Sequence, residues 1–600
     1  MSAVEQKPSA NTLADGGAFL FEENGSRPIF SCEDFTEEQR MFFKTADDFA
    51  ASEIAPRAQE IDDRGLDLMP ELLKKAADLG LCMVEIPEAH GGLGRDITTS
   101  MLVTEAMSRV GSWSTTWGAH TGIGTLPIVF FGNDAQKAKY LPRLATAEII
   151  GAYALSEAGS GSDALGARTK AVLSKDGKHY VLNGGKMWIT NSRWAGTFIV
   201  FAKVDGEKFT AFIVERDTPG FHILKEEHKI GLHGSSTCAL MFEDAMVPVE
   251  NVLGEIGKGH RIAFNILNHG RIKLGIGALG GCRHMLEIAV KYARDRKQFN
   301  TAIIDFGLIR RKVADMAAKT YALQAMGYRT AGLIDTRIAT VPKDSADHDK
   351  NGIDAIEEHN IEASIIKVFG SEALNFCIDE ALQIHGGYGF TEEYPIAKPY
   401  RDSRVNRIFE GTNEINRMLI PGTLLKRALK GKLPLMQYVG TTEQELAAGK
   451  LPKAPEGTLG AERRATELAK RQFALAVGAA AMKFQANLEK EQSILSDLAD
   501  AVMEVFAMDS CVTRARQAIA KFGEAKAKLH VDCTRYYVAG ASERITSLVR
   551  RVACESAEGA ELEALLGKLM KLDGSSTVNQ GPLREAVAAQ VVELNGLVLP

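Results

Sequence analysis

Glu410 is the residue whose neighbours most clearly favour chemistry. It lies in "RVNRIFEGTNEINR", residues 404–417, between the ring of Phe409 and the small residue Gly411. A carboxyl group kept from water has a raised pKa, which suits it to take a proton from carbon near neutral pH. The stretch therefore makes Glu410 a candidate for acid–base chemistry; a surface acid or a helix N-cap is the alternative.

A loop of small residues is the second candidate for a functional site. "YALSEAGSGSDALG", residues 153–166, contains the Ser156 hydroxyl, a Gly-Ser-Gly-Ser run at 159–162 and Asp163. Small residues let backbone N–H groups approach a phosphate or the polar edge of a flat ring. Taken alone, the loop is equally well explained as a surface turn.

Further motifs follow in a fixed order: "MWITNS" at 187, "YARDRKQFN" at 292, "QIHGGYGF" at 383 and "IFEGTNEINR" at 408. In this order and at this spacing, residues 35–430 closely resemble the acyl-CoA dehydrogenase family of flavoproteins. "FNILNHGR" at 264 and the additional residues after 430 are most similar to its very-long-chain branch.

The resemblance implies an oxidoreductase that converts a fatty acyl-CoA to the trans-2-enoyl-CoA in fatty-acid β-oxidation. A carboxylate removes the α-proton, the β-hydrogen leaves as hydride to FAD, and an electron-transfer flavoprotein takes the electrons. Glu410 matches the base, and Arg271 matches a residue that orients it. Some relatives carry the base at the position of Gly270, which has no side chain to serve.

The resemblance also assigns FAD contacts. Those lining the flavin ring and pyrophosphate are Tyr153, Leu155, Ser156, Gly161 and Ser162. The ring-packing aromatic and a hydroxyl near the flavin are Trp188 and Thr190. The residues that match contacts to the FAD of a neighbouring subunit are Arg296, Gln298, Phe299, Gln383, Gly386 and Gly387. Those near the adenine diphosphate are Thr412 and Glu414. These matches imply a homodimer or a higher oligomer.

Two functions on the same fold remain as alternatives. An acyl-CoA oxidase hands its electrons to oxygen, and a non-catalytic relative assembles a respiratory complex. Chain length also stays open, because Gly118, Gly122 and Gly124 suit a deep acyl channel whereas Trp117 could shorten it. Gly307, where many relatives have Gln, again resembles the very-long-chain branch.

Bulk composition excludes several classes of protein. A net charge of −6 and a pI near 6.2 provide no basic surface for nucleic acid. The eight cysteines have no C-x-x-C spacing, which favours reduced thiols over a disulfide framework or a zinc site. The polar N-terminus has no signal or transit pattern, and no apolar run reaches the ~18 residues that cross a bilayer. We therefore expect a cytoplasmic protein with at most peripheral membrane contact and no metal.

Helical and strand-like periodicity predict a mainly α protein with a central β domain. This order differs from alternating βαβ units and disfavours a nicotinamide-binding fold. The resemblance implies the acyl-CoA dehydrogenase fold: a helical domain, a small β-barrel and a four-helix bundle, here with an additional C-terminal helical domain. The expected segments are a flexible tail at 1–33, helices at 34–150, the β domain at 151–255, the helical bundle at 256–430, a linker at 431–460 and helices at 461–600.

Two tempting motifs are set aside. "GIGALG" at 275–280 matches a dinucleotide fingerprint but lacks the preceding strand, so we expect close helix packing. "DHDKNGIDAIEE" at 347–358 matches a calcium loop, but Asp354 stands where an aliphatic residue belongs. We interpret it as an exposed acidic insertion between helices.

Overall fold

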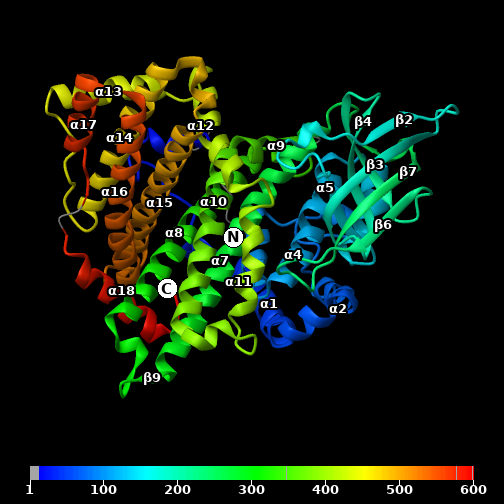
Figure 1. The fold of residues 1–600 in the computed structure, drawn as a ribbon, viewed down its shortest axis with the longest axis horizontal. Helices are drawn as coiled ribbons and strands as arrows, with labels where there is room; N and C mark the ends of the chain where they lie inside the picture. Colours follow the sequence, from blue (N-terminus) through cyan, green and yellow to red (C-terminus); the bar gives the residue numbers. More distant parts are fainter. Residues whose placement is uncertain (1–12, 346, 576–577, 598, 600) are drawn as a thin grey trace, which may run out of the picture.

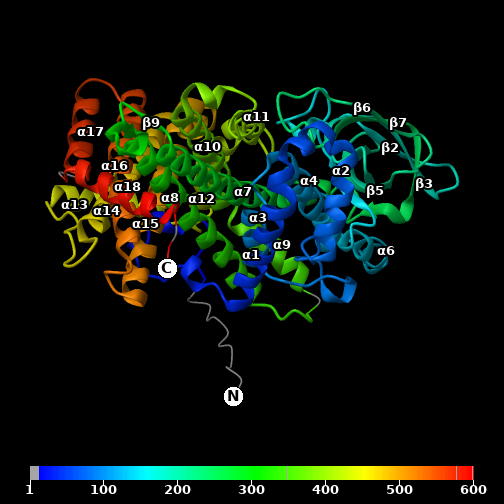
Figure 2. The same cartoon turned by 90° about the horizontal axis from the view of Figure 1, so that it is seen from below.

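The computed structural model describes residues 13–345, 347–575, 578–597 and 599. A β-sheet lies at one end of the long axis, the last helices lie at the other, and the longest helices run between them (Figures 1 and 2). The predicted fold class, mainly helical with a central β domain, is confirmed. Among the described residues, no helix is both long enough and apolar enough to cross a bilayer.

Two of the N-terminal helices, α1 and α6, begin with side-chain caps. Thr36 accepts from the backbone N–H of Gln39, and Asn133 does the same for Gln136, so each pair forms a reciprocal capping box. The helices are α1 Glu37–Phe49, α2 Ala58–Asp78, α3 Ile97–Ala106, α4 Gly111–Ala119, α5 Leu126–Phe131 and α6 Asp134–Ala145.

The β domain is an eight-stranded sheet in the order β6-β7-β3-β2-β4-β5-β8, with β1 beside β4. Alternation of buried and exposed residues along β3 and β7 places one face on the core. The strands are β1 Ile150–Ala154, β2 Lys170–Leu173, β3 His179–Thr190, β4 Ala195–Val204, β5 Lys208–Glu215, β6 Phe221–Glu226, β7 Thr237–Pro248 and β8 Val252–Leu253.

The central bundle is built around α7 Gly259–Asp295 and α10 Asn360–His385. The "GIGALG" motif lies inside α7, where an added Cβ at Gly275 would be 2.3 Å from Ile366 of α10. Close helix packing through small residues is therefore confirmed for this motif. The other elements of this region are β9 Lys297–Gln298, β10 Thr301–Ala302, α8 Gly307–Ile338, α9 His348–Glu358, α11 Ala397–Ser403 and α12 Asn413–Leu429.

The acidic segment 347–358 does not form an exposed insertion. Most of it is the helix α9, and its residues Gly352, Ile353, Ala355 and Ile356 are buried. The expectation of an exposed segment is wrong because the acidic side chains occupy only one face of an amphipathic helix.

The last helices stack beside α8 and α12 at the far end from the sheet (Figure 1). The segment expected as a linker contains a helix, α13 Leu435–Ala447. The other helices are α14 Gly460–Phe484, α15 Gln492–Phe522, α16 Lys528–Ser556, α17 Gly559–Lys571 and α18 Gln580–Leu594.

The expectation of a flexible tail is wrong for residues 13–33, while residues 1–12 lie outside the described residues. Phe19 and Leu20 are buried in the main hydrophobic core, and Asn24 Nδ2 donates to the backbone carbonyl and to Oδ1 of Asp509. The sequence predicted a flexible segment because the residues that its few apolar side chains contact lie hundreds of positions away.

Candidate active site

The loop that carries Glu410 is held by its backbone carbonyls. Arg271 Nε donates to the Glu410 carbonyl over 3.3 Å, and Lys367 Nζ donates to the Gly411 carbonyl over 2.7 Å. Asn416 Nδ2 also donates to the Gly411 carbonyl, over 2.9 Å. These bonds stabilise a backbone in which Glu410 itself has a φ of 58°, an uncommon value for a residue with a side chain. Strain of this kind persists only where surrounding contacts maintain it.

The side chain of Glu410 is not held by hydrogen bonds in the way that its backbone is. Its Oε2 is buried and has no hydrogen-bond partner among the described residues. A Cβ at Gly270 would lie 2.7 Å from that oxygen, so glycine is what makes room for the carboxyl group. Burial raises the pKa of Glu410 to about 7, against the opposing charges of Arg271 and Lys367. A carboxyl group in this state can accept a proton near neutral pH.

The edge of the β domain contributes three predicted residues to the same region. Tyr153 on β1 is buried with an unpartnered hydroxyl and is close enough to Glu410 for that charge to raise its pKa. Thr190 ends β3 and lines the cavity described below. Trp188 sits at a break in the β3–β7 register with a φ of 59° and is 61% exposed. Such a bulge turns a side chain away from the sheet, here an aromatic ring toward the surface.

The Gly-Ser loop is fixed from beneath by a buried ion pair. Lys186 Nζ lies 2.7 Å from Glu157 Oε1, and Glu157 also accepts from the backbone N–H of Arg168 and Thr169. The loop beyond stays open, because a Cβ at Gly159 or Gly161 would meet nothing within 4 Å. Ser162 is exposed, and the carbonyls of Leu155 and Ser156 accept from Lys186 and Met187.

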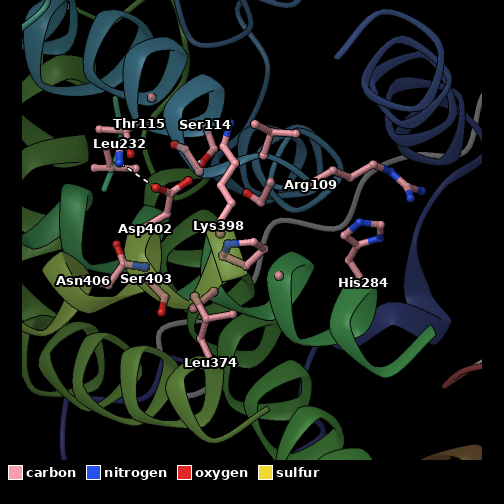
Figure 3. A pocket seen from close by; sticks show the side chains of 18 of the residues that line it. Arg109, Ser114, Thr115, Leu232, His284, Leu374, Lys398, Asp402, Ser403 and Asn406 are labelled. Carbon is pink, nitrogen blue, oxygen red and sulfur yellow. Dashed lines mark hydrogen bonds between the residues drawn. The ribbon is translucent and has the colours of Figure 1, made fainter. Parts of the chain in front are cut away.

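A cavity of about 410 Å³ starts at Glu410 and runs along α7. Half-buried residues at helical spacing form its wall on α7: Gly270, Leu274, Gly277, Gly281 and His284. Trp117, Gly118 and Gly122 line the opposite side. Figure 3 shows the labelled side chains around it, with Leu232 and Asp402 joined by a hydrogen bond of 2.6 Å.

Of the remaining predicted residues, only Thr412 and Glu414, which follow Glu410 in sequence, lie near it within one chain. Arg296 follows the end of α7 and lies over the ring of Tyr388, which places it beside the predicted residues Gln383, Gly386 and Gly387. Arg271 and Arg296 are 25 positions apart, which spans about 37 Å along a helix. Phe299 is 90% exposed, and Gln298 is exposed as well. Thr412 caps α12 by accepting from Ile415, and Glu414 lies exposed in its first turn.

Sequence reasoning missed Lys367, the second cation at the base loop. It is fully buried in α10, donates to Asn413 as well as to Gly411, and burial lowers its pKa to about 7. A lysine within the apolar run "ASIIKVFG" was the available signal, because a buried ammonium group requires partners.

Family models match four segments of the chain. They are the acyl-CoA dehydrogenase N-terminal domain at 36–148, its middle domain at 152–245 and its C-terminal domain at 257–425, with a further acyl-CoA dehydrogenase C-terminal domain at 468–571.

Several known proteins are similar over most of the chain. A probable acyl-CoA dehydrogenase of Bacillus subtilis is 46% identical, covering 97% of this chain and 98% of its own length. The human mitochondrial very long-chain specific acyl-CoA dehydrogenase is 35% identical, covering 82% of this chain and 75% of its own length. A crystal structure of an acyl-CoA dehydrogenase complexed with FAD from Bacillus anthracis superposes with a TM-score of 0.95 at 46% identity, covering 98% of this chain and 100% of that one.

Proposed function

The chain belongs to the acyl-CoA dehydrogenase family, and we propose that it oxidises long-chain fatty acyl-CoA to trans-2-enoyl-CoA with Glu410 as general base. The observation that carries this proposal is a buried carboxyl group, without a hydrogen-bond partner, at the head of a long cavity. Most buried polar groups are hydrogen-bonded, so an unpaired carboxyl oxygen at the wall of a cavity favours a chemical role over a structural one.

The residues around this end of the cavity fit FAD. The buried Tyr153 hydroxyl has no partner, the ring of Trp188 is turned out of the sheet, and the loop at Gly159 and Gly161 leaves open space beside its backbone. Tyr153, Leu155, Ser156, Trp188 and Thr190 would hold the flavin, and Gly161 and Ser162 its phosphates. When bound, FAD supplies the acceptor for the hydride that leaves the β-carbon of the substrate.

Proton removal is the part performed by this chain's own residues. Glu410 accepts the α-proton, because burial has raised its pKa into the range where it still ionises but binds a proton well. Arg271 and Lys367 hold the loop by its carbonyls, so the carboxyl group is positioned without being hydrogen-bonded. The backbone N–H of Glu410 is the proposed donor to the thioester oxygen as negative charge develops there.

The small side chains along α7 support a long acyl chain as substrate. From Gly270 to Met285 the wall covers 15 positions, or about 22 Å. A saturated chain advances roughly 1.3 Å per carbon, given single bonds of about 1.5 Å. The cavity therefore accommodates about 17 carbons, and Trp117 flanks it without closing it.

We also propose a homodimer or higher oligomer in which the partner completes each FAD site. Arg296, Gln298 and Phe299, with Gln383, Gly386 and Gly387, are about 37 Å along α7 from the base loop. They are exposed, apart from the half-buried Arg296, so they are available to a neighbouring copy.

The test is anaerobic reduction of the purified holoenzyme by saturated acyl-CoAs of increasing length, followed by the loss of flavin absorbance. We expect bleaching to be most efficient for chains of about 14–18 carbons, in line with the length of the α7 wall. Absence of bleaching with every chain would overturn the proposal. Reoxidation by an electron-transfer flavoprotein that is much faster than reoxidation by air separates the dehydrogenase from an oxidase.

A further inference from the structure

The far end of the cavity is polar, in contrast to its middle. The wall between Glu410 and this end is lined by Trp117, Leu274 and Ala278, and Leu374 packs beside Gly281 farther along. The far end is lined by side chains that can hydrogen-bond: Ser108 and Arg109 from the turn between α3 and α4, His284 from α7, and the exposed residues Gln59, Glu392 and Glu393. Figure 3 shows Arg109 and His284 lying close together there. An acyl chain that fills the cavity therefore ends among polar groups.

The positions along α7 fix the distance of this polar end from the base. His284 is 14 residues beyond Gly270, so it lies about 21 Å farther along the helix. Ser108 begins this polar end nearer the base, because a Cβ at Gly277, about 10 Å along the helix from Gly270, would be 3.2 Å from its Oγ. Only a long chain reaches His284; a chain of six carbons ends before Ser108.

The polar groups at this end have hydrogen-bond donors and acceptors that are not used within the protein. Arg109 donates through Nε and one amino group to Asp47 Oδ1, over 3.1 and 2.6 Å, and no bond is recorded for its other amino group among the described residues. His284 Nδ1 is buried without a hydrogen bond and lies 3.9 Å from Glu287. Ser108 Oγ donates to the Thr104 carbonyl over 2.6 Å and remains free to accept.

Charge at this end favours a neutral group. Arg109 is offset by Asp47, and His284 is accompanied by Glu287. At the opening, the exposed Glu392 is paired with Arg401, and the exposed Glu393 adds negative charge. A hydroxyl group can accept from Arg109 and exchange hydrogen bonds with His284, whereas a carboxylate would add charge next to acids that are already present.

We propose that this cavity binds acyl-CoA whose terminal carbon carries a hydroxyl group, and that Ser108, Arg109 and His284 receive that hydroxyl. The inference rests on the proposed function, because it assumes that the acyl chain runs from Glu410 along α7. A hydroxyl left in an apolar site without a partner costs about 1–3 kcal/mol, whereas one that finds partners costs little. The penalty for the hydroxyl therefore depends on chain length.

The experiment compares two matched pairs of ligands on the Glu410→Gln holoenzyme, which is expected to bind without turnover. Calorimetry measures Kd for hexanoyl-CoA against ω-hydroxyhexanoyl-CoA, and for hexadecanoyl-CoA against ω-hydroxyhexadecanoyl-CoA. We expect the hydroxyl to weaken binding by about tenfold or more on the short chain, and by less than about threefold on the long chain. An equal penalty at both lengths overturns the inference.

A substitution at His284 tests whether this residue accounts for the small penalty that the hydroxyl carries on the long chain. His284→Leu should raise the penalty on the long chain toward the short-chain value and leave the short-chain ratio unchanged. Ile288→Leu, on α7 but outside the cavity lining, serves as the control and should leave both ratios unchanged. An unchanged long-chain ratio in His284→Leu also contradicts the inference. Failure of the proposed function has a different sign: hexadecanoyl-CoA would not bleach the flavin of the wild-type enzyme. That result does not depend on the Kd ratios measured for the hydroxylated ligands.

Discussion

Glu410 and Asp509 are both buried carboxyl groups in helical parts of the molecule, but their surroundings are opposite. Asp509, on α15, accepts from Asn24, Lys470 and Arg329, with distances of 3.0, 2.8 and 2.7 Å. Glu410 leaves one oxygen without a partner. Burial raises the pKa of both groups, but at Asp509 it is outweighed by Lys470 and Arg329, which lower the pKa to about 2, whereas that of Glu410 reaches about 7.

This difference distinguishes an acid that stabilises the fold from an acid that can accept a proton in a reaction. Asp509 joins four segments: the N-terminal segment through Asn24, α8 through Arg329, α14 through Lys470, and its own helix. Its charge is fully compensated, so it can only stabilise the fold. Glu410 has two cations nearby, Arg271 and Lys367, but both bond to backbone carbonyls. Their charge reaches the carboxyl group without occupying its lone pairs, which remain available to a proton.

The largest expected effect is loss of activity in Glu410→Gln. The amide has nearly the same shape but cannot accept the α-proton, so we expect kcat/KM to fall by about 10³–10⁴-fold while FAD and acyl-CoA still bind. Anaerobic bleaching with hexadecanoyl-CoA measures the loss, and flavin absorbance after gel filtration checks FAD retention. Bleaching at the wild-type rate would move the base to another residue.

The same substitution should also increase stability at high pH. The folded pKa of Glu410 lies above its usual value, so the folded state binds the extra proton between about pH 4.5 and 7 and loses relative stability as the pH rises through that window. At pH 8 the neutral glutamine avoids this penalty. Glu410→Gln should therefore unfold at higher urea concentration than the wild type at pH 8, and at nearly the same concentration below pH 4.5.

Asp509→Ala should show the reverse pattern. Removing Asp509 leaves Arg329 buried without its counter-ion and Lys470 with only Glu467, and breaking a buried ion pair typically costs about 3–5 kcal/mol. We expect a lower urea midpoint at pH 7 and unchanged kcat/KM per bound flavin. Because the folded pKa is depressed, the contribution of Asp509 is present above about pH 4 and is lost as the pH falls toward 2, so the deficit shrinks on acidification. A large loss of activity per flavin with no loss of stability would break the comparison.

How much could be predicted from the sequence differs between these two acids. Glu410 could be found because its motif is local: an aromatic ring, a glycine and a helix cap within four positions. Asp509 lies in the run "VFAMDSCV" with no local sign of its partners, which come from as far as 485 positions away. The flexible tail was mispredicted for the same reason, since Asn24 and its neighbours are ordered only by that distant contact.

Within the site the same distinction holds between local and distant contacts. Trp188 and Thr190 lie on one strand, and Arg271 lies next to Gly270, so both pairs fall inside the short motifs that carry the family resemblance. Lys367 is separated by 44 positions from the carbonyl that it contacts, and only tertiary structure brings α10 to the base loop. The polar end of the cavity was missed as well, because Arg109 and His284 come from different helical segments.

The smallest expected effect tests whether Lys367 acts on Glu410 by charge. Lys367→Met removes a buried positive charge that lowers the pKa of Glu410, so that pKa should rise further and less base should be ionised at pH 7. The acidic limb of the pH profile of kcat/KM should move to higher pH by on the order of one unit. Because Lys367 and Glu410 both titrate near pH 7, the wild-type limb belongs to the pair rather than to either group.

Lys367→Arg keeps the charge and should leave the limb near its wild-type position, even if the larger group lowers kcat. A limb that stays in place in Lys367→Met, with only a lower urea midpoint, would make Lys367 another structural ion like Lys470 and would leave Arg271 as the only charge that tunes the base.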